Sequence, residues 1–258
     1  MATPDPQVSR PSARPRTLVT GCADRVGRAC ACEFARRGHD LVMIVRTLDA
    51  RAQASKAAAL AAGGAGCTVD VRACDLEDLD AVGALGGALA QSALDAIVHC
   101  AAIYEAQSIG AITAESALGH YKVNALAPLL LVQSLRGSLA RSSLAGGGAI
   151  VLFSDMHVQG RFYSGHAGYF ASKGAVDALV GALAVELGPT IRCNAIAPGV
   201  VAFPEGSDPE FVQRYIDRTP LKRAGTPEEA AACAAWLAID ATFVNGEVIR
   251  LDGGRFHR

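Results

Sequence analysis

The chain lacks a long apolar run, a surplus of charge of either sign and a secretory leader pattern. No apolar stretch reaches the ~18 residues that a membrane span requires, and the first residues do not pass from basic to apolar as a signal peptide does. The net charge of −1 argues against nucleic acid as the main partner, because phosphate binding needs an excess of lysine and arginine. These absences predict a cytoplasmic protein with neither a membrane nor a nucleic-acid partner.

The eight cysteines include no Cys-x-x-Cys pair and fall mostly inside apolar segments. This distribution is typical of buried free thiols in a reducing compartment rather than of disulfides or a metal site. We therefore expect no metal centre.

What the chain does have is a repeated alternation of short apolar runs with longer alanine-rich helical stretches. The strand candidates are residues 17–20, 40–45, 68–73, 96–100, 149–154, 192–196 and 247–251. Most are apolar along their whole length, which is typical of strands buried on both faces, and helices between them imply right-handed crossovers. With 258 residues, 51% of them hydrophobic, the predicted fold is α/β. It is a single doubly wound (Rossmann-type) parallel sheet with helices on both faces.

Residues 1–15 carry four prolines among polar residues and are predicted to form a disordered tail, followed by one ordered domain over 16–258. The stretch 115–141 is predicted to be one extended helix, bent or weakened near Pro128. Residues 200–220 are predicted to form a mobile loop over the substrate.

Tyr169 and Lys173 lie four residues apart, so in a helix both side chains leave the same face. A phenol holds its proton until pH ~10, and a nearby ammonium moves that pKa toward neutrality. Such a tyrosine can pass a proton to or from a substrate oxygen or nitrogen near physiological pH. An isolated Tyr-x-x-x-Lys pair more often lies on an exposed helix face and has no catalytic role. The motifs elsewhere in the chain therefore decide whether this pair is catalytic.

A glycine-containing turn, Thr-Gly-Cys-Ala-Asp-Arg-Val-Gly at residues 20–27, follows the first predicted strand and opens a helix. Gly21 allows a tight turn and Gly27 allows close backbone approach, while the helix N-terminus offers free N–H groups to a pyrophosphate. The position between a strand and a helix predicts a dinucleotide site.

Together with Asn124 and the segment Asn-Ala-Ile-Ala-Pro-Gly at 194–199, these motifs resemble the short-chain dehydrogenases/reductases, in the same order along the chain. The resemblance implies hydride transfer with NAD(P) in a single domain. It implies that Tyr169 donates the proton, that Lys173 lowers the tyrosine pKa and holds the nicotinamide ribose, and that Asn124 supports a water relay. It further implies a homotetramer built on the long helices that flank the sheet.

The residues at the tip of the second predicted strand distinguish between NAD and NADP as the expected cofactor. NAD-specific sheets usually carry an acid here, whereas this chain has Arg46-Thr47, and an arginine suits the 2′-phosphate of NADPH. A solvated arginine at a strand end is the alternative. Asp75-Leu76 resembles the family's adenine contact, although Asp75 could instead cap a helix. The resemblance implies these further cofactor contacts: Gly21, Arg25, Val26, Gly27, Ala101, Tyr169, Lys173, Pro198 and Gly199.

Three departures from the family pattern occur together. Arg25 stands where the glycine turn usually has a glycine, Asp155 stands where the catalytic serine is expected, and Tyr104 follows an altered segment, residues 99–102. This set resembles the pteridine reductases, in particular the bacterial dihydromonapterin and dihydrofolate reductases, as does the C-terminal segment 252–258. His99, which replaces an asparagine of the family, is expected to make a structural hydrogen bond.

A pterin is a flat, aromatic, nitrogen-rich ring, and it accounts for all three departures. Tyr104 is expected to stack on it, and Arg25 to bridge the cofactor phosphate and the pterin edge. Asp155 and Tyr169 are expected to supply a proton to a ring nitrogen as hydride reaches the neighbouring carbon. The predicted function is NADPH-dependent reduction of a pterin or dihydropterin.

Simpler interpretations stay open. Tyr104 is then an ordinary loop aromatic, Asp155 caps its loop, and Ser154 fills the serine position after a shift of one residue. His157 and His166 lie in the same loop without an assigned role. The alternative functions are a general NADPH-dependent carbonyl reductase, acting on a ketoacyl, sugar or steroid ketone, and a non-catalytic NADP-binding regulatory subunit.

Overall fold

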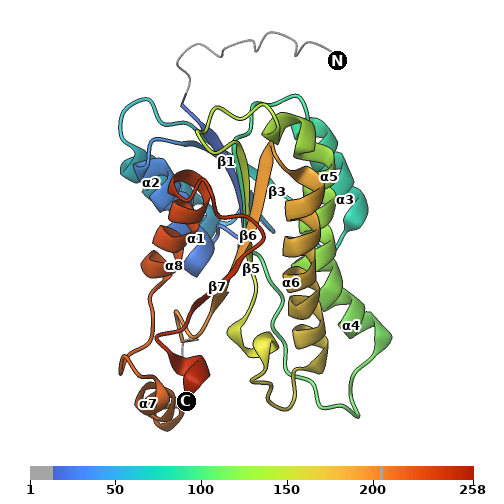
Figure 1. The fold of residues 1–258 in the computed structure, drawn as a ribbon, viewed down its shortest axis with the longest axis vertical. Coiled ribbons are helices and arrows are strands. Elements are labelled where there is room, and N and C mark those ends of the chain that lie inside the picture. The colour runs from blue at the N-terminus through green and yellow to red at the C-terminus, as the bar shows by residue number, and fades with distance from the viewer. Residues whose placement is uncertain (1–13, 204–205) are drawn as a thin grey trace.

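The computed structural model describes residues 14–203 and 206–258, and this part of the chain contains one parallel sheet in the order β3-β2-β1-β4-β5-β6-β7 (Figure 1). The strands are β1 (Arg16–Thr20), β2 (Asp40–Val45), β3 (Val69–Ala73), β4 (Ala96–His99), β5 (Gly148–Phe153), β6 (Ile191–Pro198) and β7 (Val248–Leu251). Every predicted strand is present at close to its predicted bounds, so the α/β doubly wound fold is confirmed.

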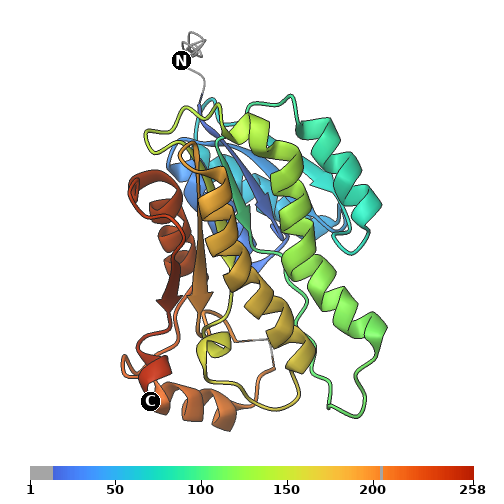
Figure 2. The ribbon, with the colours of Figure 1, turned by 45° about the vertical axis from the view of Figure 1, so that its right-hand side comes forward.

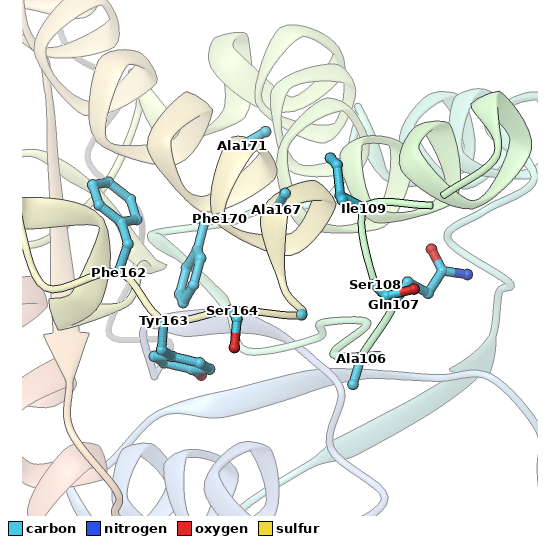
Figure 3. A pocket seen from close by; sticks show the side chains of 11 residues that line it. Ala106, Gln107, Ser108, Ile109, Phe162, Tyr163, Ser164, Ala167, Phe170 and Ala171 are labelled. Carbon is cyan, nitrogen blue, oxygen red and sulfur yellow. The ribbon is translucent and has the colours of Figure 1, made fainter. Parts of the chain in front are cut away.

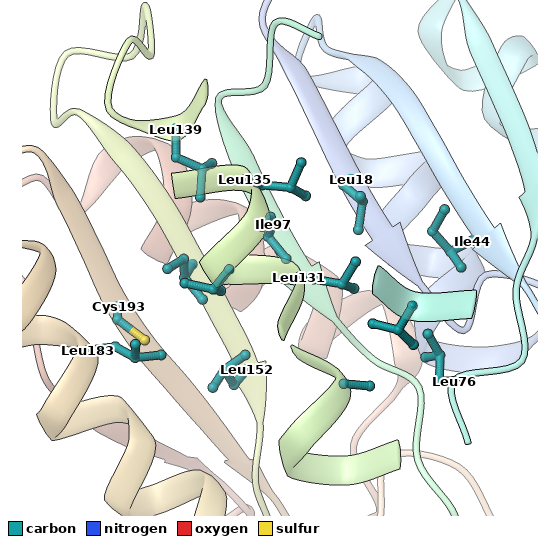
Figure 4. Packing of buried hydrophobic residues seen from close by; sticks show 14 of the residues in the cluster. Leu18, Ile44, Leu76, Ile97, Leu131, Leu135, Leu139, Leu152, Leu183 and Cys193 are labelled. Carbon is teal, nitrogen blue, oxygen red and sulfur yellow. The ribbon is translucent and has the colours of Figure 1, made fainter. Parts of the chain in front are cut away.

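Helices cover both faces of the sheet (Figures 1 and 2). One face carries α1 (Arg25–Arg36), α2 (Ala50–Gly63) and α8 (Pro227–Ala235), and the other carries α3 (Leu79–Leu89), α4 (Ala114–Tyr121), α5 (Ala127–Leu139) and α6 (Ala167–Leu187). Alternate residues of one strand contribute to the two cores: Leu18 packs toward α5 (Figure 4), and its neighbour Val19 belongs to the core that contains α1. Both are fully buried. This two-sided burial explains why the strands read as continuous apolar runs.

The predicted long helix is continuous but changes its winding in the middle. Between α4 and α5 lies a π-helical turn, Lys122–Leu126, in which the N–H of Ala127 bonds to the carbonyl of Lys122. Pro128 follows directly, and it has no N–H to offer the carbonyl of Asn124, four residues earlier. The widened turn therefore falls where the proline removes a helical hydrogen bond.

Two predictions about irregular segments, the tail at residues 1–15 and the loop at residues 200–220, can be compared with the structure in part. Residues 1–13 of the predicted tail lie outside the described residues, whereas Pro15 already accepts a hydrogen bond from the Asp40 N–H at 2.8 Å. Of the segment 200–220, residues 204–205 lie outside the described residues, and Pro209–Arg218 forms helix α7 rather than a loop. Asp208 caps this helix and Pro209 occupies its first turn, which is a favoured start for a helix.

Within the described residues, no helix is long and apolar enough to cross a membrane. The same residues contain no group of three or more His, Cys, Asp or Glu side chains that could hold a metal ion.

Arg192 in β6 is a buried cation that serves the fold. Its guanidinium donates to five backbone carbonyls, those of Gly146, Leu237, Ala238, Ala241 and Val244. Burial lowers the pKa of this guanidinium from its ordinary value. These hydrogen bonds hold residues 237–244, which follow α8, against the sheet.

Replacing Arg192 with methionine is expected to lower the free energy of unfolding by at least ~3 kcal/mol, because several buried carbonyls lose their donor at ~1–3 kcal/mol each. Urea denaturation measures the loss. The matched control is Arg136→Met on the exposed face of α5. A loss below ~1 kcal/mol would show that the network contributes little.

Candidate active site

The site residues gather where the strands end at the carboxyl edge of the sheet, which is where open α/β sheets bind ligands. Tyr169 lies on the first turn of α6 and is buried, and its hydroxyl donates to Oδ2 of Asp155 at 2.8 Å. Asp155 follows β5 and caps the short helix Met156–Gln159. A hydrogen bond between these two predicted catalytic side chains thus joins the helix to the segment after the strand.

The other carboxylate oxygen of Asp155 accepts hydrogen bonds from His157, to which the sequence analysis assigned no role. Oδ1 accepts the ring Nδ1–H of His157 at 2.7 Å and the backbone N–H of the same residue at 2.8 Å. The one sequence feature that could have indicated this pairing is the Asp-x-His spacing at 155–157, because an aspartate that caps a turn lies beside the residue two positions on.

Two opposing effects set the pKa of Asp155. Burial raises the pKa of this carboxyl, but the hydrogen bonds from His157 and Tyr169 outweigh burial and hold it below its ordinary value. Asp155 is therefore ionised at neutral pH. In this state it accepts hydrogen bonds from both side chains, and its part in protonating the substrate stays a prediction.

Lys173 lies one turn after Tyr169 on the same helix face, as the spacing predicted. Its Nζ is 5.8 Å from the centre of the tyrosine ring and donates to the carbonyl of Phe153 at 2.6 Å. Burial lowers the pKa of Lys173 to about 8.

The pKa of Tyr169 is set by groups other than Lys173 in this structure. Burial, the largest cause, raises this pKa well above its ordinary value, and the negative charge of Asp155, to which the hydroxyl is bonded, raises it further. The expected lowering of this pKa by Lys173 stays a prediction. Tyr169 is accordingly a neutral phenol, which can donate a proton.

Asn124 lies in the π-helical turn and joins the loop after β4 to α6. Its amide donates to the carbonyl of Ile103 at 3.0 Å and to the hydroxyl of Ser172 at 2.9 Å, and its Oδ1 accepts the N–H of Ile103 at 2.8 Å. The side chain is almost completely buried. Asn124 therefore fixes the loop that carries Tyr104 against the helix that carries Tyr169.

Ser154, the alternative occupant of the serine position, faces elsewhere. Its hydroxyl donates to the carboxylate of Asp177 on α6, while Asp155 faces Tyr169. The geometry thus brings Asp155, and not Ser154, to the tyrosine.

Tyr104 lies against Tyr169, the residue predicted to donate the proton. Its ring meets that of Tyr169 edge to face, with centroids 4.8 Å apart, and its hydroxyl is 3.0 Å from that of Tyr163. His166 stacks on it at 4.7 Å, and 54% of the residue remains exposed. The loops after β4 and β5 therefore form an aromatic wall beside Tyr169.

A pocket of about 900 Å³ is lined by residues of these two loops and of α6, and Figure 3 shows its side chains. Ile109 contributes from the loop after β4, and Phe162, Tyr163 and Phe170 contribute from the loop after β5 and from α6. Its lining does not include Asp155 or Tyr169, so we do not assign it to the catalytic pair.

The glycine turn has the shape that a dinucleotide needs. A Cβ on Gly21, whose φ is +71°, would lie 2.8 Å from the Ala101 nitrogen, and one on Gly27 would lie 2.1 Å from the Gly21 carbonyl oxygen. Helix α1 begins within this segment, at Arg25, so its first-turn N–H groups, Val26 among them, face the carboxyl edge of the sheet. The turn fits a pyrophosphate.

Arg25 takes an unusual backbone conformation in this turn. Its φ is +47°, in the left-handed region that favours glycine, which is the residue expected there in the family. The exposed side chain donates to the carbonyl of Ala202, in the segment after β6. Arg25 thus bridges the two segments that would flank a bound cofactor.

The remaining predicted cofactor residues lie along the same edge. Arg46 and Thr47 are exposed directly after β2. Pro198 ends β6, and the Gly199 N–H bonds to the Leu251 carbonyl at 2.9 Å.

Asp75 and Leu76 follow β3, the first exposed and the second buried. Asp75 accepts the N–H of Glu77 at 3.0 Å, while α3 is capped by Asp78, so Asp75 is not the helix cap considered as the alternative.

His99 has the structural role expected of it. Its ring nitrogens bond to the Thr20 hydroxyl at 3.0 Å and to the Val123 carbonyl at 3.1 Å. Burial, with a smaller effect of Lys173, lowers its pKa to about 3, so it is neutral.

A dinucleotide turn, a Tyr–Lys pair on one helix face and an asparagine in the adjoining helix define an oxidoreductase of the nicotinamide-dependent class. The family model described as enoyl-(acyl carrier protein) reductase matches residues 21–255. The chain belongs to the short-chain dehydrogenase/reductase family.

The similar proteins are named for different substrates. The chain is 34% identical to an uncharacterized oxidoreductase of Methylorubrum extorquens, with 92% of this chain and 96% of the other covered. It is 30% identical to dihydromonapterin reductase of Shigella boydii (93% and 96% covered) and 32% identical to L-xylulose reductase of Bos taurus (93% and 95%). A solved structure described as an NAD(P)-dependent gluconate 5-dehydrogenase from Beutenbergia cavernae, with bound NADP, superposes with a TM-score of 0.85 at 28% identity. It covers 96% of this chain and 98% of its own.

Proposed function

We propose that this oxidoreductase reduces a pterin or dihydropterin with NADPH. The observation that carries the proposal is the hydrogen bond from Tyr169 to the carboxyl group of Asp155, beside the ring of Tyr104. A carboxylate accepts hydrogen bonds from the ring N–H and amino groups of a pterin. A ketone offers only an acceptor oxygen, which that charge would disfavour.

NADPH, when bound, supplies the hydride. The turn at Gly21 and Gly27 and the N-terminus of α1 hold its pyrophosphate, and Arg46 pairs with its 2′-phosphate. Lys173, Pro198 and Gly199 hold the nicotinamide end.

On the substrate side, Tyr169 gives its proton to the nitrogen of a C=N bond. The raised pKa of Tyr169 keeps the hydroxyl protonated before the hydride is transferred, when the substrate nitrogen becomes basic. Asp155 orients the phenol, and Tyr104 provides a flat surface for the ring. Arg25, which is exposed at the cofactor turn, reaches the oxygen edge of the pterin. Asn124 keeps the loop of Tyr104 in place.

A general carbonyl reductase is the second candidate, because the chain is as similar to L-xylulose reductase as to dihydromonapterin reductase. Asp155 in place of serine counts against it, since a serine hydroxyl can donate to a carbonyl oxygen and a carboxylate cannot. A non-catalytic NADP-binding subunit would have no use for the assembled set of Asn124, Tyr169 and Lys173.

We further infer a cytoplasmic homotetramer. Helix α6 exposes a stripe of small apolar residues on its outer face: Ala171, Ala178, Gly181, Ala182 and Val185. Helices that are apolar all round are normally covered, so this face is expected to pack on a second copy. All eight cysteines are free, which suits a reducing compartment. Size-exclusion chromatography with light scattering tests the assembly.

Tyr104→Ala is expected to raise the KM for a dihydropterin about 2- to 10-fold, because a stacked aromatic surface contributes ~0.5–1.5 kcal/mol beyond area burial. Steady-state NADPH oxidation measures it. The control is Phe243→Ala, which removes a fully exposed aromatic ring far along the chain from the site. An unchanged KM would make Tyr104 an ordinary loop aromatic.

A crystal structure with NADPH and a pterin analogue tests the assignment. The ring is expected between the nicotinamide and Tyr104, with its amino edge within hydrogen-bond distance of Asp155. A ring bound elsewhere would contradict the pterin site and favour the carbonyl reductase.

A further inference from the structure

Asp155 joins two side chains that can carry protons. Its Oδ2 accepts the hydroxyl of Tyr169 at 2.8 Å, and its Oδ1 accepts the ring Nδ1–H of His157 at 2.7 Å. The three groups form one continuous hydrogen-bonded chain, from an imidazole through a carboxylate to a phenol.

His157 is held in place while keeping some contact with solvent. The edge of its ring meets Tyr163, with centroids 4.9 Å apart, and it lies 6.1 Å from the ring of Phe170. Its side chain retains 19% exposure, whereas Tyr169 is buried. The chain of three groups therefore leads from the aromatic wall at the surface to the reacting hydroxyl.

The groups facing Asp155 come from three elements. His157 lies on its own turn, and Tyr169, Lys173 and Asp177 lie on α6. Tyr163 lies in the loop between them. Lys173 donates to the Phe153 carbonyl and Asp177 accepts from Ser154, so these two act on Asp155 through charge alone.

We propose that His157 is a positioning residue that acts through Asp155 to return a proton to Tyr169 after each turnover. The inference rests on the proposed function, in which Tyr169 protonates the substrate. It assigns a source of protons separate from the route through Lys173 and Asn124 that the family resemblance implies.

When Tyr169 has given its proton to the substrate nitrogen, the phenolate lies beside an ionised carboxylate, which disfavours both charges. Nε2 of His157 takes a proton from solvent and its Nδ1 proton moves to Oδ1 of Asp155, so the ring becomes the neutral form protonated at Nε2. Rotation of the Asp155 carboxyl group carries that proton to the phenolate oxygen, which leaves the carboxylate ionised. Exchange of the ring proton with solvent then restores the Nδ1–H form of His157. One solvent proton is consumed for each proton delivered.

The first test needs no substrate. Long-range ¹H–¹⁵N NMR reads which ring nitrogen of a histidine carries the proton. Wild-type protein is expected to show His157 with its neutral form protonated at Nδ1, because Asp155 accepts there. Asp155→Ala is expected to release the ring to a mixture of tautomers. A His157 protonated only at Nε2 in wild type would overturn the proposal.

The second test separates positioning from proton return. His157→Asn keeps a donor where Nδ1 lies but cannot relay, and His157→Phe keeps only the ring shape. Both are expected to lower kcat for a dihydropterin about 10-fold or more, with the NADPH dissociation constant unchanged. Both are expected to recover with added imidazole buffer, which wild type does not need. His257→Asn is the control, since that histidine is exposed in the short helix Arg255–His257, and its kcat is expected to show no response to imidazole.

The outcomes distinguish the two claims. Full activity in His157→Asn with loss in His157→Phe would make His157 a purely structural partner and overturn the relay while the proposed function stands. If wild type oxidises NADPH with no pterin or ketone, the proposed function fails, and the relay fails with it.

Discussion

Replacing Tyr169 with phenylalanine is expected to lower kcat by ~10²-fold or more, which is the usual contribution of a positioned general acid. The substitution removes only the hydroxyl that bonds to Asp155, and leaves the ring against Tyr104 and Phe170. NADPH affinity should therefore change little. Steady-state NADPH oxidation gives kcat, and quenching of intrinsic fluorescence on titration with NADPH gives the dissociation constant.

The matched control is Tyr121→Phe, which removes the hydroxyl of an exposed tyrosine on α4. It should leave both quantities unchanged. A Tyr169→Phe enzyme with near-normal turnover would show that the proton comes from another group.

Arg46→Ala is expected to weaken NADPH binding about 10- to 100-fold. The arginine is exposed at the tip of β2, and a hydrogen bond to a charged partner contributes ~1.5–3 kcal/mol. NADH binding should be nearly unchanged, because NADH has no 2′-phosphate. Titration of wild type and variant with both nucleotides measures the difference.

Arg51→Ala is the control for Arg46, since Arg51 lies five positions on, at the start of α2, where it already pairs with Asp49 at 3.1 Å. It should alter NADPH binding far less. A wild-type preference for NADH would contradict the assignment of Arg46 to the 2′-phosphate.

The sheet could be predicted from sequence because burial on both faces leaves an unbroken apolar run in each strand. The weak point of the long helix could be predicted because Pro128 lacks an N–H. The same proline also explains the position of Asn124, which lies in the widened turn before it. The strands and this turn can be predicted because they depend on residues that are close together in the sequence.

The electrostatics of the site could not be predicted in the same way. The spacing of Tyr169 and Lys173 shows that they share a helix face, but the pKa of Tyr169 depends on burial and on a carboxylate 14 residues earlier. Whether Ser154 or Asp155 faces Tyr169 depends on how β5 ends. The role of His157 depends on a turn that brings its ring back onto Asp155.

The backbone of Arg25 gives a further example. The sequence shows a substitution for glycine, but the left-handed conformation and the bond to Ala202 arise from the contact between two segments far apart in the chain. Such contacts between distant segments carry no local sequence pattern.

The most direct measurement is NADPH oxidation by the purified protein with dihydromonapterin, dihydrobiopterin and dihydrofolate beside a panel of ketoacyl, sugar and steroid ketones. A site whose carboxylate binds N–H donors should favour at least one dihydropterin over every ketone by ~10²-fold or more in kcat/KM. Brisk reduction of a ketone with no turnover of any pterin would contradict the account and make the protein a general carbonyl reductase.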